Sequence, residues 1–359
     1  MDTFGRKFRV SIFGESHGDG IGVVLDGVQP GISLQKEDFT EDILRRKSGP
    51  KGTTPRIEAD EPEILSGVFN GYTTGAPLAI IFRNQNTRSG DYKLFNDMPR
   101  PGHADYTASV KWLDFNDPRG GGHFSGRLTL PIVAAGVIAK KMCVCSIKAR
   151  ILEVGGVSRE DALKTLTQEE IGGVDTELLS PSLIWKEVLN KVILEKDSVG
   201  GVVECRVDGV PAGVGEPFFD SVESLVSHAI FAIPGVRGIE FGDGFQAARM
   251  KGSEHNDPFD CVGGDDVCAC WSKDPEVCHP SKNGAGGVNG GITNGNPIVF
   301  RVAFKPTSSI GKAQETFNFT TGKMETLEIP GRHDACFALR TPPVVEAMTA
   351  IVLADLMAL

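Results

Sequence analysis

The chain has 359 residues, of which 40% are hydrophobic and 23% charged, and its formal net charge at pH 7 is −10. This composition is ordinary for a globular protein, and the acidic balance argues against general nucleic-acid binding. A small anionic ligand would need a local pocket of cations. Glycine is the informative residue: 44 copies stand against a usual share of ~7%, in blocks typical of tight turns and close backbone approach to a ligand.

No apolar run reaches the ~18 residues that would predict a membrane-spanning helix. The first residues also lack the apolar core of a secretory signal. We therefore expect a cytoplasmic protein with no membrane partner, whose eight cysteines are reduced thiols rather than a disulfide framework.

The first predicted strand, 8–13, leads into a polar loop bracketed by glycines, Gly14-Glu15-Ser16-His17-Gly18. The glycines allow a sharp turn, and an imidazole held there can move a proton or hold an anion. A solvated surface turn is the alternative. The letters also fit G-x-S-x-G, but a strand at 22–27 rather than a helix follows, which argues against a serine nucleophile.

A helix predicted at 35–47, capped by Ser33, ends in Arg45-Arg46-Lys47. These cations suit either a helix C-terminus or an anion pocket. Further elements are predicted in the first half as strands at 64–69 and 77–82 and helices at 104–115 and 130–145, separated by polar or glycine-rich loops at 48–60, 84–100 and 117–127.

Residues 151–200 are richer in acids and contain an amphipathic helix at 182–196, so we interpret them as a peripheral helical region. From 201 the pattern of the first half recurs. The strand 202–210 and its turn resemble 25–31, a helix at 220–230 follows, and the strand 298–304 mirrors 77–82. The hypothesis is an internal duplication, with chance similarity of two turns as the alternative. A strong helix is predicted at 342–359.

Three histidines lie in glycine-containing loops: His17, His103 within Arg100-Pro101-Gly102-His103-Ala104-Asp105, and His333 within Gly331-Arg332-His333-Asp334. A lone histidine is more often structural, but this grouping predicts that at least two share one site. His103 also precedes a helix N-terminus, which favours an anion.

The cations form a second set, in or beside glycine and proline loops rather than at helical i,i+4 spacing. They are Arg45, Arg46, Lys47, Lys51, Arg100, Arg119, Arg127, Lys305 and Arg332. Lys305-Pro306-Thr307-Ser308-Ser309 places a lysine and three hydroxyls at a strand end, which suits a phosphate. The Walker spacing is absent, and a polar strand-to-loop junction is the alternative.

Two weaker patterns occur in the second half. Gly242 to Ala247 fits G-x-G-x-x-A, but the segment after it does not continue a βαβ unit, which argues against a dinucleotide site. The Cys-rich segment 258–282 contains Cys261, Cys268, Cys270 and Cys278. The adjacent pair Cys278-His279 is awkward for tetrahedral zinc, so we predict no metal and interpret the segment as an atypical surface loop.

Several long motifs occur together and in order: Phe13 to Gly18, Arg100 to Tyr106, Lys251-Gly252-Ser253, Gly290-Gly291-Ile292, Lys305 to Ser309 and Gly331 to Asp334. Through them the sequence, from residue 5 to the final helix, resembles the chorismate synthase family. The resemblance implies an α+β fold in which 1–359 forms one β-α-β sandwich domain, usually within a homotetramer.

The resemblance further implies a carbon–oxygen lyase of the shikimate pathway of aromatic amino acid biosynthesis. It would convert 5-enolpyruvylshikimate 3-phosphate to chorismate and phosphate by a 1,4-anti elimination. The implied cofactor is reduced FMN, without net redox change; FAD and NADP belong to the same set of flavoprotein expectations, and NADPH is a candidate reductant. The alternatives are a flavin reductase or other flavin-dependent oxidoreductase, and a non-catalytic FMN- or phosphate-binding module.

Site roles follow from the resemblance residue by residue. His17 and His103 would act as acids near flavin and substrate phosphate, and Asp334 would help to remove the C6 proton. The FMN site would comprise His123, Phe124, Ser125, Pro234, Gly235, Gly290, Lys305, Pro306, Thr307, Ser308, Ser309 and Arg332. Cations for substrate or NADP would be Arg46, Lys51 and Arg127.

The sequence departs from the family pattern in three places. The usual G-G-G-R-S-S-A-R is here Gly120 to Arg127 with His123 in place of the first arginine, and histidine can be neutral at pH 7. The usual R-R-R-P-G is here Arg45 to Gly49 with Lys47, which cannot form a forked pair as arginine does. The segment 258–282 has no evident counterpart.

Overall fold

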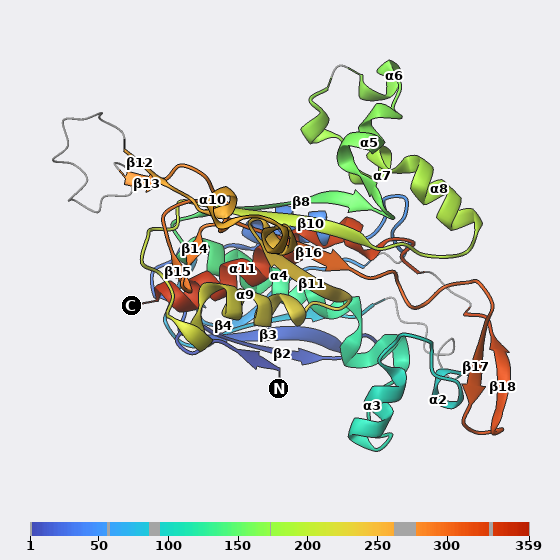
Figure 1. The fold of residues 1–359 in the computed structure, drawn as a ribbon. Coiled ribbons are helices and arrows are strands. Elements are labelled where there is room, and N and C mark those ends of the chain that lie inside the picture. The colour runs from blue at the N-terminus through green and yellow to red at the C-terminus, as the bar shows by residue number, and fades with distance from the viewer. Residues whose placement is uncertain are drawn as a thin grey trace.

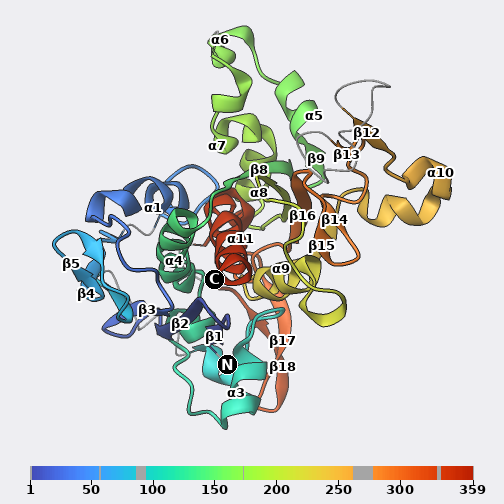
Figure 2. The same ribbon diagram turned by 90° about the vertical axis from the view of Figure 1, so that its left-hand side faces the viewer.

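The computed structural model describes residues 2–55, 58–85, 94–172, 174–261, 278–329 and 333–358. Two five-stranded antiparallel sheets enclose a layer of helices (Figures 1 and 2). Sheet one has the order β1 (Thr3–Phe4), β2 (Arg9–Gly14), β3 (Gly20–Asp26), β7 (Leu78–Arg83) and β4 (Glu63–Ser66). Sheet two has the order β11 (Val236–Phe241), β16 (Ile298–Phe304), β10 (Gly201–Asp208), β8 (Ser146–Val154) and β9 (Val157–Ser158). The α+β sandwich inferred from the resemblance is confirmed.

The helix layer contains α1 (Thr40–Arg46), α4 (Thr129–Met142), α9 (Val222–Phe231) and α11 (Pro342–Met357). Residues 343–354 of α11 are buried on every side, because sheets and neighbouring helices surround it. The sequence had shown only an apolar stripe. Gly136 permits the close packing of α4 on α11, since a Cβ there would lie 2.3 Å from Ala347 Cβ.

One buried acid joins three of these helices. Glu346 on α11 is 2% exposed and accepts hydrogen bonds from Arg45 Nη2 at 2.7 Å and Lys140 Nζ at 2.9 Å. Arg45 is therefore paired inside the helix layer. This favours a structural role at the end of its helix over a role in an anion pocket.

The two halves repeat one order of elements, as the duplication hypothesis expects. The first half runs through β3, α1, β4, the hairpin of β5 (Val68–Phe69) and β6 (Tyr72–Thr73), and β7. The second half runs through β10, α9, β11, the hairpin of β14 (Val288–Asn289) and β15 (Ile292–Thr293), and β16, with further short elements inserted between β11 and β14. Thr73 Oγ1 donates to Gln29 O at 2.6 Å, and Thr293 Oγ1 donates to Pro211 O at 2.7 Å. Equivalent bonds in equivalent turns favour duplication over chance.

The peripheral helical interpretation of 151–200 is only partly right. Strand β8 runs into this region and lies between β10 and β9 in sheet two. The helices α5 (Arg159–Lys164), α6 (Gln168–Ile171), α7 (Pro181–Ile184) and α8 (Lys186–Leu194) project from the body (Figure 1). Trp185 is nevertheless 1% exposed and belongs to the main core, because the base of this projection packs on the sandwich.

Smaller elements surround the sandwich. They are α2 (Leu94–Asp97), α3 (Asp105–Trp112), α10 (Gly252–His255), β12 (Phe259–Cys261), β13 (Cys278–Pro280), β17 (Gln314–Asn318) and β18 (Lys323–Leu327). Strands β2 and β3 pair directly, so no helix follows Ser16 and the serine-nucleophile pattern is not supported. After β11 come a 3₁₀ segment, Gly244–Arg249, and the four-residue α10, which is no dinucleotide-binding unit.

The thiols with described side chains, Cys143, Cys145, Cys205 and Cys336, are free. Cys268 and Cys270 lie outside the described residues, and the side chains of Cys261 and Cys278 are not described. Within the described ranges, no three His, Cys, Asp or Glu side chains gather as a metal site requires. None of the helices there is both long and apolar enough to span a membrane.

Candidate active site

Two adjoining cavities lie between the sheets and the loops at their ends. The larger has a volume of about 810 Å³ and the smaller about 210 Å³. Seven residues line both, so the cavities form one continuous site: His103, Phe124, Gly126, Thr307, Ser308, Asp334 and Arg340.

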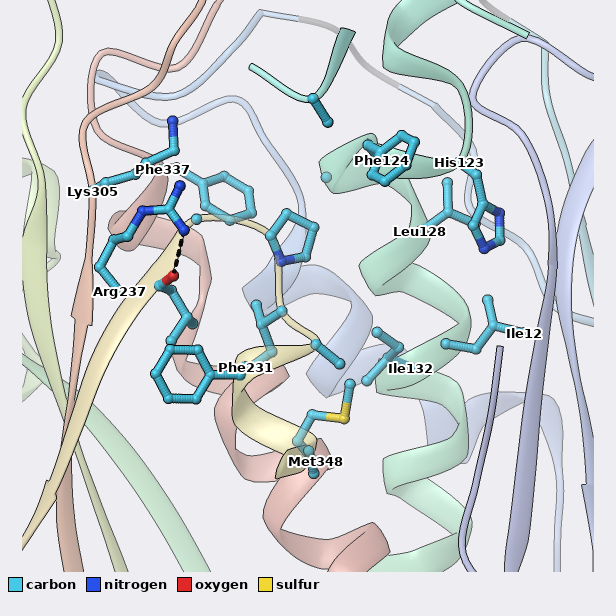
Figure 3. Close-up of a pocket in the computed structure, with 18 of the residues that line it drawn as sticks. Ile12, His123, Phe124, Leu128, Ile132, Phe231, Arg237, Lys305, Phe337 and Met348 are labelled. Carbon is cyan, nitrogen blue, oxygen red and sulfur yellow. Dashed lines mark hydrogen bonds between the residues drawn. The ribbon is translucent and has the colours of Figure 1, made fainter. Parts of the chain in front are cut away.

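The larger cavity is apolar over most of its depth and basic at one end (Figure 3). Ile12, Ile132 and Met348 come from β2, α4 and α11, whereas Lys305 and Arg237 lie together at the opposite side. Burial, with the charge of Arg237, lowers the pKa of Lys305. The shape and charge suit a flat aromatic ligand with an anionic tail.

The segment Lys305 to Ser309 meets the His103 loop directly. Lys305 Nζ donates to Gly102 O at 3.0 Å and also to Ser308 Oγ. Ser308 Oγ in turn donates to Gly102 O at 2.7 Å. Thr307 Oγ1 is buried and has no hydrogen-bond partner among the described residues. The strand-end lysine and hydroxyls therefore line a cavity, as the phosphate interpretation predicts, rather than a solvated junction.

His103 is fixed by a carboxylate. Its Nδ1 lies 2.6 Å from Asp105 Oδ1, and Arg100 donates to the same carboxylate from Nε at 2.7 Å and Nη2 at 2.8 Å. The short contact assigns a proton to Nδ1 and leaves Nε2 for a ligand. Burial lowers the pKa of His103, opposed by the hydrogen bond to Asp105. The resting imidazole is therefore neutral at pH 7, and a bound anion would favour its protonated form.

Replacement of Asp105 by asparagine should move the pH profile of turnover. Asp105 raises the pKa of His103, so its neutral analogue should lower that pKa further. A histidine that must be protonated supports turnover below its pKa and loses it above. We expect the alkaline fall of kcat/KM to shift to lower pH in Asp105→Asn, measured from pH 5 to 9. A uniform loss at every pH would contradict this role.

The glycines Gly120, Gly121 and Gly122 separate two histidines at close range. Their φ angles are 63°, 80° and 53°, in the left-handed region that favours glycine. A Cβ on Gly120 would lie 2.1 Å from His17 Nδ1, and one on Gly121 would lie 3.4 Å from His103 Nε2. The hypothesis was that at least two of His17, His103 and His333 share one site, and the structure supports it: His103 and His333 both line the smaller cavity. Within the described chain, however, buried His17 lines neither cavity.

His123 stands where the family pattern has arginine, and it ties two loops together. Its Nδ1 lies 2.8 Å from Gly14 O and its Nε2 3.1 Å from Asp2 Oδ1. The ring also lines the larger cavity (Figure 3). Ser125 lines the smaller cavity, and Asn84 bonds both Glu15 O and Arg127 Nε, which connects the opening loop to that cavity.

Among the described residues, the lining of the smaller cavity includes five cations and three acids: Arg46, Lys47, Arg100, Arg127 and Arg340, and Glu58, Asp60 and Asp334. It therefore carries a positive balance inside an acidic protein. Burial lowers the pKa of Arg46 to about 9, with the charges of Arg340 and Arg127 adding to the effect. Arg46 still carries its charge at pH 7.

Asp334 lies at the junction of the two cavities and is 8% exposed. Its Oδ1 accepts from Thr54 N at 2.9 Å, and its Oδ2 accepts from Arg340 Nη2 at 2.8 Å. Arg340 itself stacks over the Phe337 ring at 4.9 Å. The carboxylate thus faces the site in one orientation.

Comparisons with known proteins now decide the family. The family model described as chorismate synthase matches residues 8–358. The chain is 54% identical to the chorismate synthase of Chitinophaga pinensis over 361 residues, covering 100% of this chain and 97% of the relative. It is 43% identical to that of Dehalococcoides mccartyi, covering 99% and 96%. The chain belongs to the chorismate synthase family.

The fold comparison agrees. A crystal structure of a chorismate synthase superposes with a TM-score of 0.68 at 25% identity, covering 98% of this chain and 92% of that one. Membership in the chorismate synthase family makes the chain an enzyme of the lyase class.

Most residues that the chorismate synthase resemblance assigned to FMN line the two cavities. His123, Phe124, Pro234, Gly235 and Lys305 to Ser308 line the larger, and Ser125 and Ser309 the smaller. Two site assignments are not supported: Gly290 of the FMN set lies in the β14–β15 turn, and the side chain of Lys51, from the substrate or NADP set, is exposed. Neither residue lines either of the two cavities. Arg332 falls outside the described residues.

Sequence reasoning missed Asp60, Asp105 and Arg340 as site residues of this chorismate synthase family member. Asp105 was visible within the His103 motif, and its spacing of two residues from a histidine was the available signal. Asp60 and Arg340 reach the site only through loop folding, from 280 residues apart in sequence. Nothing in their local sequence indicates that they meet.

Proposed function

We propose that the chain is a chorismate synthase that eliminates phosphate from 5-enolpyruvylshikimate 3-phosphate with reduced FMN bound. The observation that carries the proposal is the junction of two cavities of different character at His103 and Asp334. An apolar cavity suits a flavin ring, and an adjoining cationic cavity suits a substrate with a phosphate and two carboxylates.

The residues fit FMN at the larger cavity. Apolar side chains from three elements line the space that a flavin ring would occupy, and Lys305 and Arg237 form a basic end for a phosphate (Figure 3). Thr307 Oγ1 is a buried hydroxyl with no partner among the described residues, so it is available to a ligand oxygen. Bound reduced FMN would supply transient electron density to the allylic system of the substrate.

The chain's own residues account for the proton and charge movements. The elimination breaks the carbon–oxygen bond to phosphate and removes a proton from C6, so the leaving group gains charge. His103 Nε2, held by Asp105 through Nδ1, donates to the departing phosphate. Asp334, oriented by Thr54 and Arg340, is the carboxylate that assists removal of the proton. The cations of the smaller cavity stabilise the departing phosphate and the carboxylates of the substrate.

The test is anaerobic incubation of the folded protein with substrate and chemically reduced FMN. Chorismate should form, and none should form with oxidised FMN alone. A folded protein that yields no chorismate under reducing conditions would contradict the proposal. Replacing the chemical reductant with NADPH tests the redox alternative: chorismate under these conditions would mean that the chain also reduces its own flavin.

We also propose the homotetramer that the family resemblance implies, and cytoplasmic location remains a prediction. Large aromatic side chains support association: Phe115, Phe218 and Phe219 are 90%, 86% and 91% exposed. Exposed aromatic side chains are available for an interface between copies of the chain, where such residues are enriched. Sedimentation equilibrium should give four chains, and a monomer would contradict the proposal.

A further inference from the structure

Asp60 is a buried acid on which two arginines of the smaller cavity converge. Its side chain is 3% exposed. Arg46 Nη1 lies 3.3 Å from Asp60 Oδ2, and Arg127 Nη1 donates to Asp60 Oδ1. Each carboxylate oxygen therefore serves a different guanidinium group.

The backbone of Asp60 is strained. Its φ of 57° lies in the left-handed region, which is uncommon for residues other than glycine, although aspartate and asparagine adopt it more readily than most. Such conformations persist where the surroundings fix the residue, and they gather at functional sites. In this left-handed conformation the carboxylate of Asp60 lies between the two arginines.

The remaining donors of the two arginines differ. Arg46 is held on its other nitrogens, since Nε donates to Thr129 Oγ1 at 3.0 Å and Nη2 to Gly126 O at 3.4 Å. Arg127 Nε donates to Asn84 Oδ1 at 3.0 Å. Arg127 Nη2 is buried at the cavity and has no hydrogen-bond partner in the described part of the chain. Both N–H groups of Arg127 Nη2 are thus left for a ligand.

We propose that Asp60 is a positioning residue: it holds Arg46 and Arg127 in the register that turnover of a bound anion requires, directs Arg127 Nη2 at that anion, and weakens simple anion binding by cancelling one of the two positive charges. The ligand class is a phosphate or carboxylate. Only the turnover readout below rests on the proposed function, because anion binding is measured without substrate or flavin.

The Asp60→Asn substitution removes the negative charge of residue 60 and leaves the shape of the side chain nearly unchanged. Asparagine also tolerates the left-handed backbone, but it cannot neutralise a guanidinium. The cavity gains one positive charge, and a free anion can take the place of the lost carboxylate. Inorganic phosphate should therefore bind at least about tenfold more tightly, while kcat falls about 10²-fold because the arginines are no longer held in register.

The measurements are isothermal titration with inorganic phosphate and steady-state turnover. Glu346→Gln is the matched control, because Glu346 is also a buried acid held by two cations but lines neither cavity. It should lose stability while its phosphate affinity stays at the wild-type value. Phosphate affinity in Asp60→Asn that is unchanged or weaker would overturn the proposal, since a purely structural acid gives that result.

A second variant keeps the proposal testable if Asp60→Asn does not fold. Arg127→Gln removes the directed N–H groups and one charge, so phosphate should bind at least about tenfold more weakly than to the wild type. Wild-type affinity in folded Arg127→Gln would also overturn the proposal. If the wild-type protein failed to form chorismate, the phosphate titrations would still decide the role of Asp60.

Discussion

Replacement of His103 by alanine should lower kcat by about 10²- to 10⁴-fold, the usual contribution of a well-placed general acid, while FMN affinity changes far less. The imidazole is held by Asp105 through Nδ1, and Nε2 is the atom left for the leaving phosphate. Alanine removes the proton donor but leaves the apolar walls and the basic end of the larger cavity in place. Steady-state kinetics and flavin fluorescence titration measure the two effects.

The matched control is His255→Ala. His255 also bonds to an aspartate, with its Nδ1 3.0 Å from Asp243 Oδ2, but it lies on α10 and lines neither cavity. Its loss should leave kcat at the wild-type value. A His103→Ala enzyme that turned over at the wild-type rate would remove this residue from the catalytic set.

Replacement of Gly120 by alanine should abolish most activity with a smaller effect on stability. The new Cβ would lie 2.1 Å from His17 Nδ1 and 2.8 Å from Ser16 Oγ, so the loop or the imidazole must move. Displacement of a site by about 1 Å can cost about 10²-fold in rate. The left-handed backbone adds about 1–2 kcal/mol of strain for a residue with a Cβ. Turnover and thermal unfolding report the two costs.

Gly156→Ala separates strain from displacement. Gly156 has φ of 83° and no atom within 4 Å of a Cβ built on it, so alanine there brings strain without contact. It should lose a similar amount of stability and keep full turnover. Equal kinetic losses in the two variants would show that backbone strain, not displacement of the His17 loop, governs the effect of Gly120→Ala.

Much of the framework could be predicted from the sequence, because its apolar patterns are regular. The predicted strand 298–304 is confirmed as β16, and the final helix as α11. Strand β8 was missed for two physical reasons. Only residues 143–145 separate it from α4, so the helical interpretation ran on to its edge. Its exposed positions include the charged residues Lys148 and Arg150, which obscure the apolar pattern of the buried Ile147 and Ile151.

The site was predicted in part: local motifs were found from the sequence, and contacts between distant loops were not. Motifs that bring their own turn chemistry, such as the His103 loop and Lys305 to Ser309, lie together in the cavities. Charge pairing between distant loops has no local pattern, so Asp60 with Arg46 and Arg127 could not be foreseen. Lys51 was assigned to the substrate or NADP site through the family resemblance, but its side chain is exposed.

The most direct test of the account is the stoichiometry of a single anaerobic incubation with substrate and chemically reduced FMN. Chorismate, phosphate and flavin redox state are measured together in the same sample. The account requires one chorismate and one phosphate for each substrate consumed, with the flavin still reduced at the end. Phosphate release without chorismate, or flavin oxidised in proportion to product, would contradict a redox-neutral elimination at this site.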